Sequence, residues 1–185
     1  MNSSAQGTWQ HLGLRDFVES DSAAVFDVYG DPDVAGPLGL PTLSRAQVAG
    51  LVASTIESAR SSTRRGYHFA VVAGDRVIGT ATLGRDPHQP EAACLGFALR
   101  KDVWGHGHGT RTARALLEFG FEALGLHRVW GACLTTNEAS AATLLRAGMT
   151  REGLIRGHLK VGEVWCDTAT YGILRQEWSG YRRSG

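Results

Sequence analysis

Long hydrophobic runs are missing from this sequence. No stretch approaches the ~18 consecutive apolar residues of a membrane span. The first residues, MNSSAQGTW, lack the basic segment and apolar run of a signal peptide. We therefore expect a cytoplasmic protein without a membrane anchor.

Cysteine is also scarce. Cys94, Cys133 and Cys166 lie far apart and show no metal-ligand spacing. An odd number of cysteines argues against a closed disulfide framework and suits a reducing compartment. The sequence therefore predicts neither disulfides nor a cysteine-based metal site.

A charge excess of either sign is absent, because 19 basic and 18 acidic side chains leave a net charge of +1. Such a balance provides no overall field that would attract nucleic acid or a membrane surface. Lysine is rare, with only Lys101 and Lys160 beside 17 arginines. We attribute this skew to codon usage, and a nucleic-acid-binding function has only the arginine count in its favour.

The 185 residues are enough for one domain that buries about 70% of its unfolded surface. We expect a single domain over residues 1–185 with an ordered core at 9–178 and short tails at both ends, the second at 179–185. Strands are predicted at 9–14, 67–73, 76–83, 93–99, 128–134, 150–159 and 163–174, and helices at 20–29, 44–60, about 110–124 and 139–146.

Three local signals support these boundaries. Ser44 followed by Gln47 forms a capping box at the start of the second helix. Gly74-Asp75 is typical of a two-residue hairpin turn. Three prolines and two glycines within residues 31–41 predict an irregular loop there.

The order of the elements predicts an α/β (α+β) fold with a mixed sheet. A strand at 93–99, a long helix and a strand at 128–134 imply a parallel pair joined by a crossover. The helix has one apolar face, with its apolar residues at helical spacing: Ala113, Leu116, Leu117, Gly120, Phe121 and Leu124. Hairpins elsewhere make the remaining pairs antiparallel.

The strongest local motif is a glycine-rich turn at Trp104–Thr110, between a strand and the long helix. Alternate glycines let the backbone approach a ligand, and the helix N-terminus behind them favours a pyrophosphate. From the residues alone, a phosphate-binding loop and a plain tight loop remain open. His106 and His108 have no third or fourth ligand at zinc spacing nearby, so we expect no metal site.

Several motifs together resemble the GNAT acetyltransferases, and more narrowly their Rim-type branch of ribosomal-protein N-terminal acetyltransferases. The motifs occur in the expected order and cover nearly the whole chain: 12–15, 29–32, 95–99, 103–110, 137–140, 145–149, 152–156, 162–167 and 176–178. The resemblance implies a GNAT fold, with a mixed sheet of six to seven strands, splayed fourth and fifth strands and about four flanking helices.

The resemblance also implies acetyl-CoA as the cosubstrate, held by two backbone segments. Backbone groups of Phe97, Ala98 and Leu99 would pair with the pantetheine arm between the splayed strands. The loop of Trp104, Gly105, His106, Gly107, His108, Gly109 and Thr110 would hold the pyrophosphate. Asn137 would bind the pantetheine arm from the other side, although Asn at this position is also a common helix N-cap.

Direct transfer requires a neutral amine, a stabilised oxyanion and a proton for the departing thiolate. In many GNAT enzymes a tyrosine seven residues after the Asn supplies that proton, and the corresponding residue here is Leu144. The resemblance therefore points to Ser140, near the sulfur, as the catalytic hydroxyl. Ser140 is otherwise an ordinary residue of the first helical turn.

A general base is not evident in the sequence. In the family that this chain resembles, a glutamate on the fourth strand often fills this role. The corresponding residue here is Cys94. Glu91, His68, His88 and His158 are possible substitutes, of which His158 is the preferred catalytic candidate because the sixth strand borders the acceptor site. Water alone is a further alternative. Arg156 and Asp167 are expected to form an ion pair between the last two strands.

Together these features predict an acetyl-CoA-dependent N-acetyltransferase that acts on a primary amine, with a protein N-terminus as the leading acceptor. The alternatives are a small-molecule amine (an antibiotic, a polyamine or an amino-acid derivative) and a non-catalytic acyl-CoA-binding module. We expect no membrane or nucleic-acid partner, and the oligomeric state stays open between a monomer and a homodimer.

Overall fold

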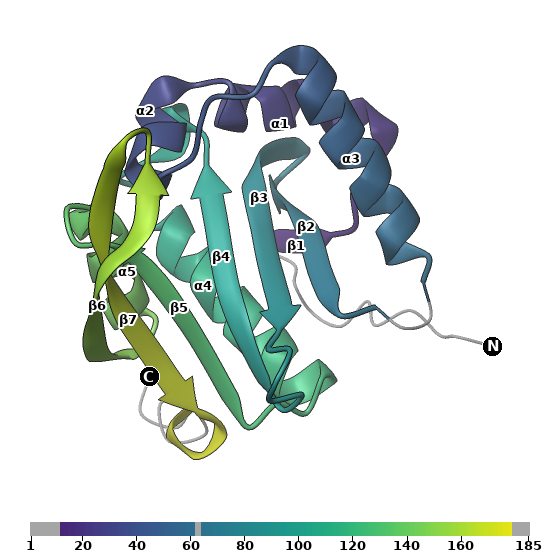
Figure 1. Cartoon of the computed structure of the whole chain (residues 1–185). Coiled ribbons are helices and arrows are strands. Elements are labelled where there is room, and N and C mark those ends of the chain that lie inside the picture. Colours follow the sequence, from purple (N-terminus) through teal and green to yellow (C-terminus); the bar gives the residue numbers. More distant parts are fainter. Residues whose placement is uncertain (1–11, 62–63, 179–185) are drawn as a thin grey trace.

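The computed structural model of the chain describes residues 12–61 and 64–178 (Figure 1). The strands are β1 (Gly13–Arg15), β2 (Gly66–Ala73), β3 (Arg76–Arg85), β4 (Ala92–Leu99), β5 (Arg128–Leu134), β6 (Thr150–Val161) and β7 (Val164–Leu174). The α-helices are α1 (Ser22–Tyr29), α2 (Pro32–Ala35), α3 (Arg45–Ala59), α4 (His108–Glu118) and α5 (Glu138–Arg146). Within this part of the chain, no helix combines the length and apolarity needed to cross a bilayer.

The strands form one seven-stranded mixed sheet in the order β1-β2-β3-β4-β5-β7-β6. The β4–β5 pair is parallel, joined by the crossover through α4, and the other neighbouring pairs are antiparallel. The predicted mixed sheet with a central parallel pair is confirmed.

The β4–β5 pair is short. Only Ala92–Cys94 pair with Arg128–Trp130, although β4 stays paired with β3 as far as Leu99 and β5 stays paired with β7 as far as Leu134. Beyond Cys94 the two strands diverge, which is visible at the centre of Figure 1. The predicted splay is therefore present.

Helices cover both faces of the sheet. The apolar face of α4, including Leu116 and Leu117, packs with α5 and with Phe121 of the turn after α4 against one face in the main core. On the opposite face, α1 and α3 bury Val25 and Val48 against the strands. The predicted amphipathic face of the long helix is confirmed, because its apolar positions carry the core.

The start of α3 agrees with the sequence prediction, whereas the end of the long helix does not. The Ser44 cap of α3 is confirmed, since the hydroxyl accepts from Gln47 N at 3.3 Å and the Gln47 amide accepts from Ser44 N at 2.8 Å. The long helix ends differently from expectation, because residues 119–123 form a π-helical turn before Gly125, which has φ of +66°.

The segment 31–41 was predicted to be irregular, and this is wrong. It contains α2 and a 3₁₀ turn at Gly36–Leu38. The Asp31 carboxylate caps α2 by accepting from Asp33 N at 2.9 Å, and Pro32 lies in the first turn, where its missing N–H costs nothing. Pro32 and Pro37 therefore lie at the starts of short helical turns here instead of preventing them.

The outer hairpin contains a second correction. The expected ion pair between Arg156 and Asp167 is not formed among the described residues. A register shift between Ile155 and Leu159 bulges β6, and Gly157 adopts φ of +55°. The Asp167 carboxylate accepts from Gly157 N at 2.7 Å instead. Of the first predicted strand, residues 9–11 lie outside the described residues, as does the predicted tail at 179–185.

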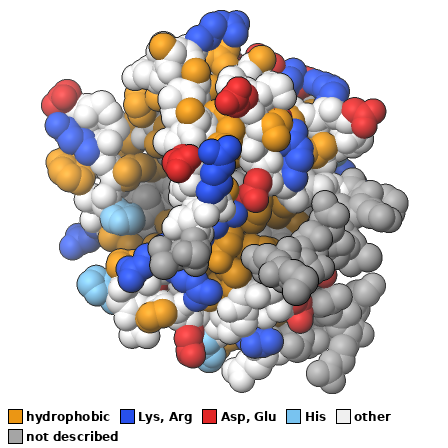
Figure 2. Space-filling view, turned by 90° about the vertical axis from the view of Figure 1, so that its right-hand side faces the viewer, with side chains coloured by type: hydrophobic (Ala, Val, Ile, Leu, Met, Phe, Trp, Pro, Cys, Tyr) orange, Lys and Arg blue, Asp and Glu red, His pale blue; other side chains and the backbone are white. Residues whose placement is uncertain are grey.

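Acidic and basic side chains are interspersed on the face that carries β2 and α3 (Figure 2). Nucleic-acid binding draws its affinity from clustered positive charge that neutralises phosphates. A surface of mixed sign does not supply this.

Two glycines of β3 test how tightly the sheet is packed beside the splay. A Cβ on Gly79 would overlap the carbonyl oxygen of Ala98, whereas a Cβ on Gly84 would meet nothing within 4 Å. We predict that Gly79→Ala lowers the free energy of unfolding by about 2 kcal/mol, because the backbone of β4 must move. Gly84→Ala, the matched control, should change it by about 0.5 kcal/mol or less. Urea unfolding measures both, and equal effects would contradict the packing described here.

Candidate functional site

The divergence of β4 and β5 opens a cavity of about 690 Å³. Its walls come from the end of β4, the glycine-rich loop, the first turns of α4 and α5, and the α2 segment. They include Val34, Pro37, Leu38, Phe97, Ala98, Leu99, Val103, Trp104, Gly105, Gly107, His108, Gly109, Thr110, Thr136, Asn137, Glu138, Ala139, Ser140, Thr143 and Arg146. The structure thus brings together nearly all the residues that the sequence assigned to cofactor binding.

The glycine-rich loop owes its shape to two left-handed residues. Gly105 and Gly107 have φ of +80° and +75°, conformations that disfavour side chains, and Gly107 is the N-cap of α4. The first intrahelical acceptor is Gly107 O, which takes the N–H of Arg111. The preceding N–H groups at this helix start have no intrahelical acceptor, and Gly107–Thr110 line the cavity, so this helix start offers donors and partial positive charge beside it.

The two loop histidines differ in position. His108 lines the cavity, and its pKa is lowered, first by burial and then by the nearby Arg111 and His106. An Arg111 guanidinium nitrogen lies 3.2 Å from His108 Nδ1. His106 is not among the described lining residues, and its Nδ1 lies 2.8 Å from Trp104 O. His108 is therefore a neutral group of the cavity wall.

Trp104 closes the end of β4. Its indole N–H donates to Leu99 O at 2.9 Å, while the residue remains 45% exposed. Leu99, Ala98 and Phe97 all line the cavity. Because β4 has no partner strand on its β5 side beyond Cys94, backbone groups of this stretch face the opening.

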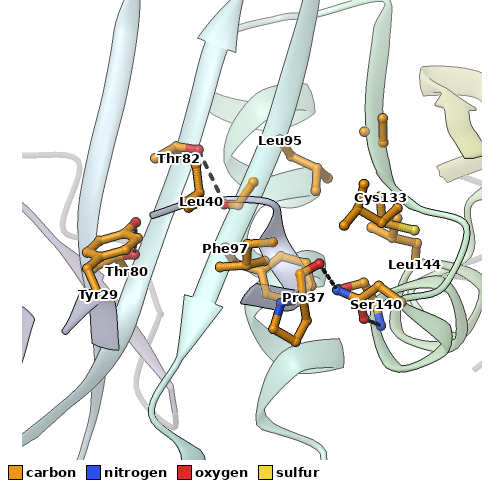
Figure 3. Close-up of a pocket in the computed structure, with 16 residues that line it drawn as sticks. Tyr29, Pro37, Leu40, Thr80, Thr82, Leu95, Phe97, Cys133, Ser140 and Leu144 are labelled. Carbon is orange, nitrogen blue, oxygen red and sulfur yellow. Dashed lines mark hydrogen bonds between the residues drawn. The ribbon is translucent and has the colours of Figure 1, made fainter. Parts of the chain in front are cut away.

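Asn137 and Ser140 face β4 from the start of α5. The Asn137 side-chain oxygen accepts from Ser140 N at 2.9 Å, so Asn137 is the N-cap of α5. Its amide nitrogen donates to Pro37 O at 2.9 Å, which ties α5 to the 3₁₀ turn (Figure 3). Asn137 therefore joins two walls of the cleft.

A second cavity of about 230 Å³ lies on the α1 side of the same opening. The two cavities share Pro37, Leu38, Phe97, Asn137 and Ser140. The remaining walls of the smaller one are Tyr29, Leu40, Thr80, Thr82, Leu95, Gly96, Gly131, Ala132, Cys133, Leu134 and Leu144. Ser140 thus lines both cavities, and Figure 3 shows it in the wall of the smaller one.

The smaller cavity contains hydroxyl groups that sequence reasoning missed. The Tyr29 hydroxyl lies 2.8 Å from Thr80 Oγ1, and Thr82 Oγ1 donates to Gly96 O at 3.4 Å. Burial raises the pKa of Tyr29, partly offset by its bond to Thr80. These residues come from α1 and β3, and no local sequence signal connects them.

A family model described as an acetyltransferase (GNAT) domain matches residues 11–150. The chain belongs to the GNAT acetyltransferase family. "Uncharacterized N-acetyltransferase YoaA" of Bacillus subtilis (strain 168) is 26% identical over 166 residues, 89% of this chain and 93% of the relative. The chain is an N-acetyltransferase of this family.

Two solved structures share the GNAT fold. One is the ribosomal-protein-S5-alanine acetyltransferase from Vibrio fischeri, with a TM-score of 0.77, 21% identity, and coverage of 92% of this chain and 96% of that chain. The other is a spermidine N-acetyltransferase from Vibrio cholerae in complex with CoA and spermine, with a TM-score of 0.79, 16% identity, and coverage of 91% and 98%. At these identities the likeness concerns the fold.

The candidate bases of this GNAT chain lie outside the walls of both cavities. His158 is exposed on β6, with Nδ1 2.8 Å from Thr168 Oγ1. His68 is opposite Thr82 in the β2–β3 register, and its pKa is lowered, mainly by burial. Glu91 and His88 are exposed before β4. Burial, aided by the charge of Asp86, raises the pKa of Cys94 to about 11, so its thiol stays protonated.

The two hydrogen bonds of Asn137 in this GNAT cleft can be separated by substitution. We predict that Asn137→Ala lowers the free energy of unfolding by about 2 kcal/mol, because it removes the helix cap and the tie to Pro37. Asn137→Ser should recover about 1 kcal/mol, since serine caps helices but does not reach as far. Urea unfolding measures both variants, and equal losses would show that the cap contributes nothing.

Proposed function

We propose that this N-acetyltransferase transfers the acetyl group to the amine of a protein N-terminus, as in the Rim-type branch that its motifs resemble. The observation that carries the proposal is the meeting of two cavities at Phe97, Asn137 and Ser140. The larger suits the cosubstrate and the smaller suits the acceptor, so the amine and the thioester would approach each other at Ser140.

In this proposal acetyl-CoA occupies the larger cavity. The N–H groups of residues 105–110 hold the pyrophosphate at the start of α4, where backbone donors and the helix dipole favour an anion. Trp104 and His106 belong to the same loop, and Trp104 lines the cavity. The pantetheine arm runs beside Phe97–Leu99, whose β5 side is unpaired, with Asn137 on the other side. The contacts of Phe97–Leu99 use backbone groups that the diverging strands leave unpaired, whereas the Asn137 side chain already bonds to Ser140 N and Pro37 O.

The transfer itself is a direct displacement. The lone pair of the neutral amine forms a bond to the thioester carbonyl carbon, and backbone N–H groups of β4 stabilise the oxyanion. The carbon–sulfur bond then breaks, and the proton lost by the amine nitrogen balances the proton gained by the thiolate. The Ser140 hydroxyl donates a hydrogen bond to that sulfur, while Leu144 is buried and apolar.

A small-molecule amine is the alternative acceptor. A polyamine carries several positive charges and would be bound best between carboxylates. No carboxylate lines the smaller cavity among the described residues. This favours an acceptor with a single amine.

A non-catalytic acyl-CoA-binding module is the second alternative. It would bind acetyl-CoA and release no thiol with any amine. Measuring thiol release from acetyl-CoA against N-terminal peptides, polyamines, aminoglycosides and amino acids separates it from an enzyme. We expect acceptor-dependent release with peptides, together with a mass gain of one acetyl group.

Ser140→Ala tests the catalytic assignment. We predict a fall in kcat of about 100-fold, because the departing thiolate loses its hydrogen-bond donor. The dissociation constant for CoA should stay within about threefold, since less than about 1 kcal/mol of binding is removed. Ser54→Ala on the exposed side of α3 makes the same chemical change far from both cavities and serves as the control. Unchanged turnover in Ser140→Ala would contradict the assignment.

A further inference from the structure

The acceptor-side cavity, the one of about 230 Å³, is lined without formal charge. Among the described residues its walls contain no Asp, Glu, His, Lys or Arg. The titratable groups in it are the Tyr29 hydroxyl of α1 and the Cys133 thiol of β5. Burial raises the pKa of both, against smaller opposing effects of Thr80 and Arg151. Both groups are therefore neutral near pH 7, and neither is a useful base.

The titratable groups around the cavity do not replace a base. On β2, His68 is beside Thr82 but outside the walls, and on β4 the Cys94 thiol is protonated. On β6, the charge of Arg151 partly offsets the effect of burial on the pKa of Cys133, and His158 Nδ1 lies 2.8 Å from Thr168 Oγ1. The carboxylates on neighbouring elements have other contacts. Asp27 pairs with Arg100 at 2.9 Å, Asp33 pairs with Lys101, and Glu138 lines the larger cavity. The carboxylates of Asp31 and Asp167 accept from Asp33 N and Gly157 N.

An ammonium ion entering such a cavity would lose hydration without gaining a counter-charge. Desolvation without a partner disfavours the charged form of an amine. A neutral amine, by contrast, can exchange hydrogen bonds with the hydroxyls of Tyr29, Thr80 and Thr82, of which Tyr29 and Thr80 are already paired at 2.8 Å. The cavity therefore suits the nucleophilic form of the acceptor.

We propose that this acceptor cavity takes up the amine already deprotonated, without a general base of the protein, and so selects weakly basic α-amines over lysine side chains and polyamines. The inference rests on the proposed function. The proton of the ammonium is released to water before binding, and the later steps are proton-neutral: the neutral amine loses one proton and the thiolate gains one.

Amine basicity then sets the specificity. At pH about 7.5, about one third of α-amines are neutral, since their pKa is about 7.7–8.0. Only about one in a thousand lysine side chains is neutral at that pH, since their pKa is about 10.4. This difference in neutral fraction gives α-amines a preference over lysine side chains on the order of 100-fold, without any specific contact to the peptide.

The test compares two peptides of equal length on the complete chain. One has a free N-terminus and no lysine, and the other has an acetylated N-terminus and one lysine at its second position. We expect kcat/KM for the α-amine to rise with pH and level off near its own pKa of about 8, and for lysine to rise without a break up to pH about 9.5. A break at the same lower pH with both peptides would reveal a base of the protein and overturn the inference alone. Absence of thiol release with any amine would overturn the proposed function as well.

A substitution in the cavity wall supplies a second test. Thr82→Glu adds a carboxylate beside the amine. Thr82→Gln is its matched control, because glutamine has the size of glutamate but no charge. We expect the ratio of lysine to α-amine kcat/KM to be about tenfold higher in Thr82→Glu than in Thr82→Gln, because the carboxylate both attracts the ammonium and accepts its proton. Equal ratios in the two variants would contradict selection by basicity.

Discussion

The early end of the β4–β5 ladder is the constraint on which the site depends. Three residue pairs hold β4 and β5 together. Beyond them, β4 pairs only with β3, and β5 pairs only with β7. Backbone groups in a protein interior need hydrogen-bond partners. The exposed side of β4 therefore favours a ligand that carries amides of its own, and the sheet is held open by the rest of the fold.

Several elements keep this gap from closing. The 3₁₀ turn after α2 lies beside the opening, where the carbonyl of Pro37 accepts from the Asn137 side chain. The indole N–H of Trp104 donates to the carbonyl of Leu99, the last residue of β4. The left-handed residues Gly105 and Gly107 then turn the chain into α4. The same arrangement divides the opening into a larger cavity at the helix start and a smaller, uncharged one toward Tyr29.

Much of this architecture could be predicted from the sequence because its signals are local. Helical spacing of apolar residues identified α4, the Ser44–Gln47 capping box identified the start of α3, and alternate glycines identified the loop of the larger cavity. These features depend on residues close together in the chain, for which local geometry is decisive.

The features that could not be predicted depend on distant or irregular contacts. The hydroxyl pair of Tyr29 and Thr80 joins residues 51 positions apart, so no local pattern reveals it. The register of β6 shifts at the bulge around Gly157, and the Asp167 carboxylate accepts from Gly157 N instead of pairing with Arg156. Prolines in segment 31–41 indicated a loop, yet Pro32 lies in the first turn of α2, which Asp31 caps, and Pro37 lies in the 3₁₀ turn.

A crystal structure of the complete chain with CoA would locate the cosubstrate. We expect the pantetheine arm to lie between β4 and β5 beside Phe97–Leu99, with the pyrophosphate at Gly105–Thr110 and the sulfur near Ser140. CoA bound away from the diverging strands, or β4 and β5 paired along their whole length in the complex, would contradict this expectation.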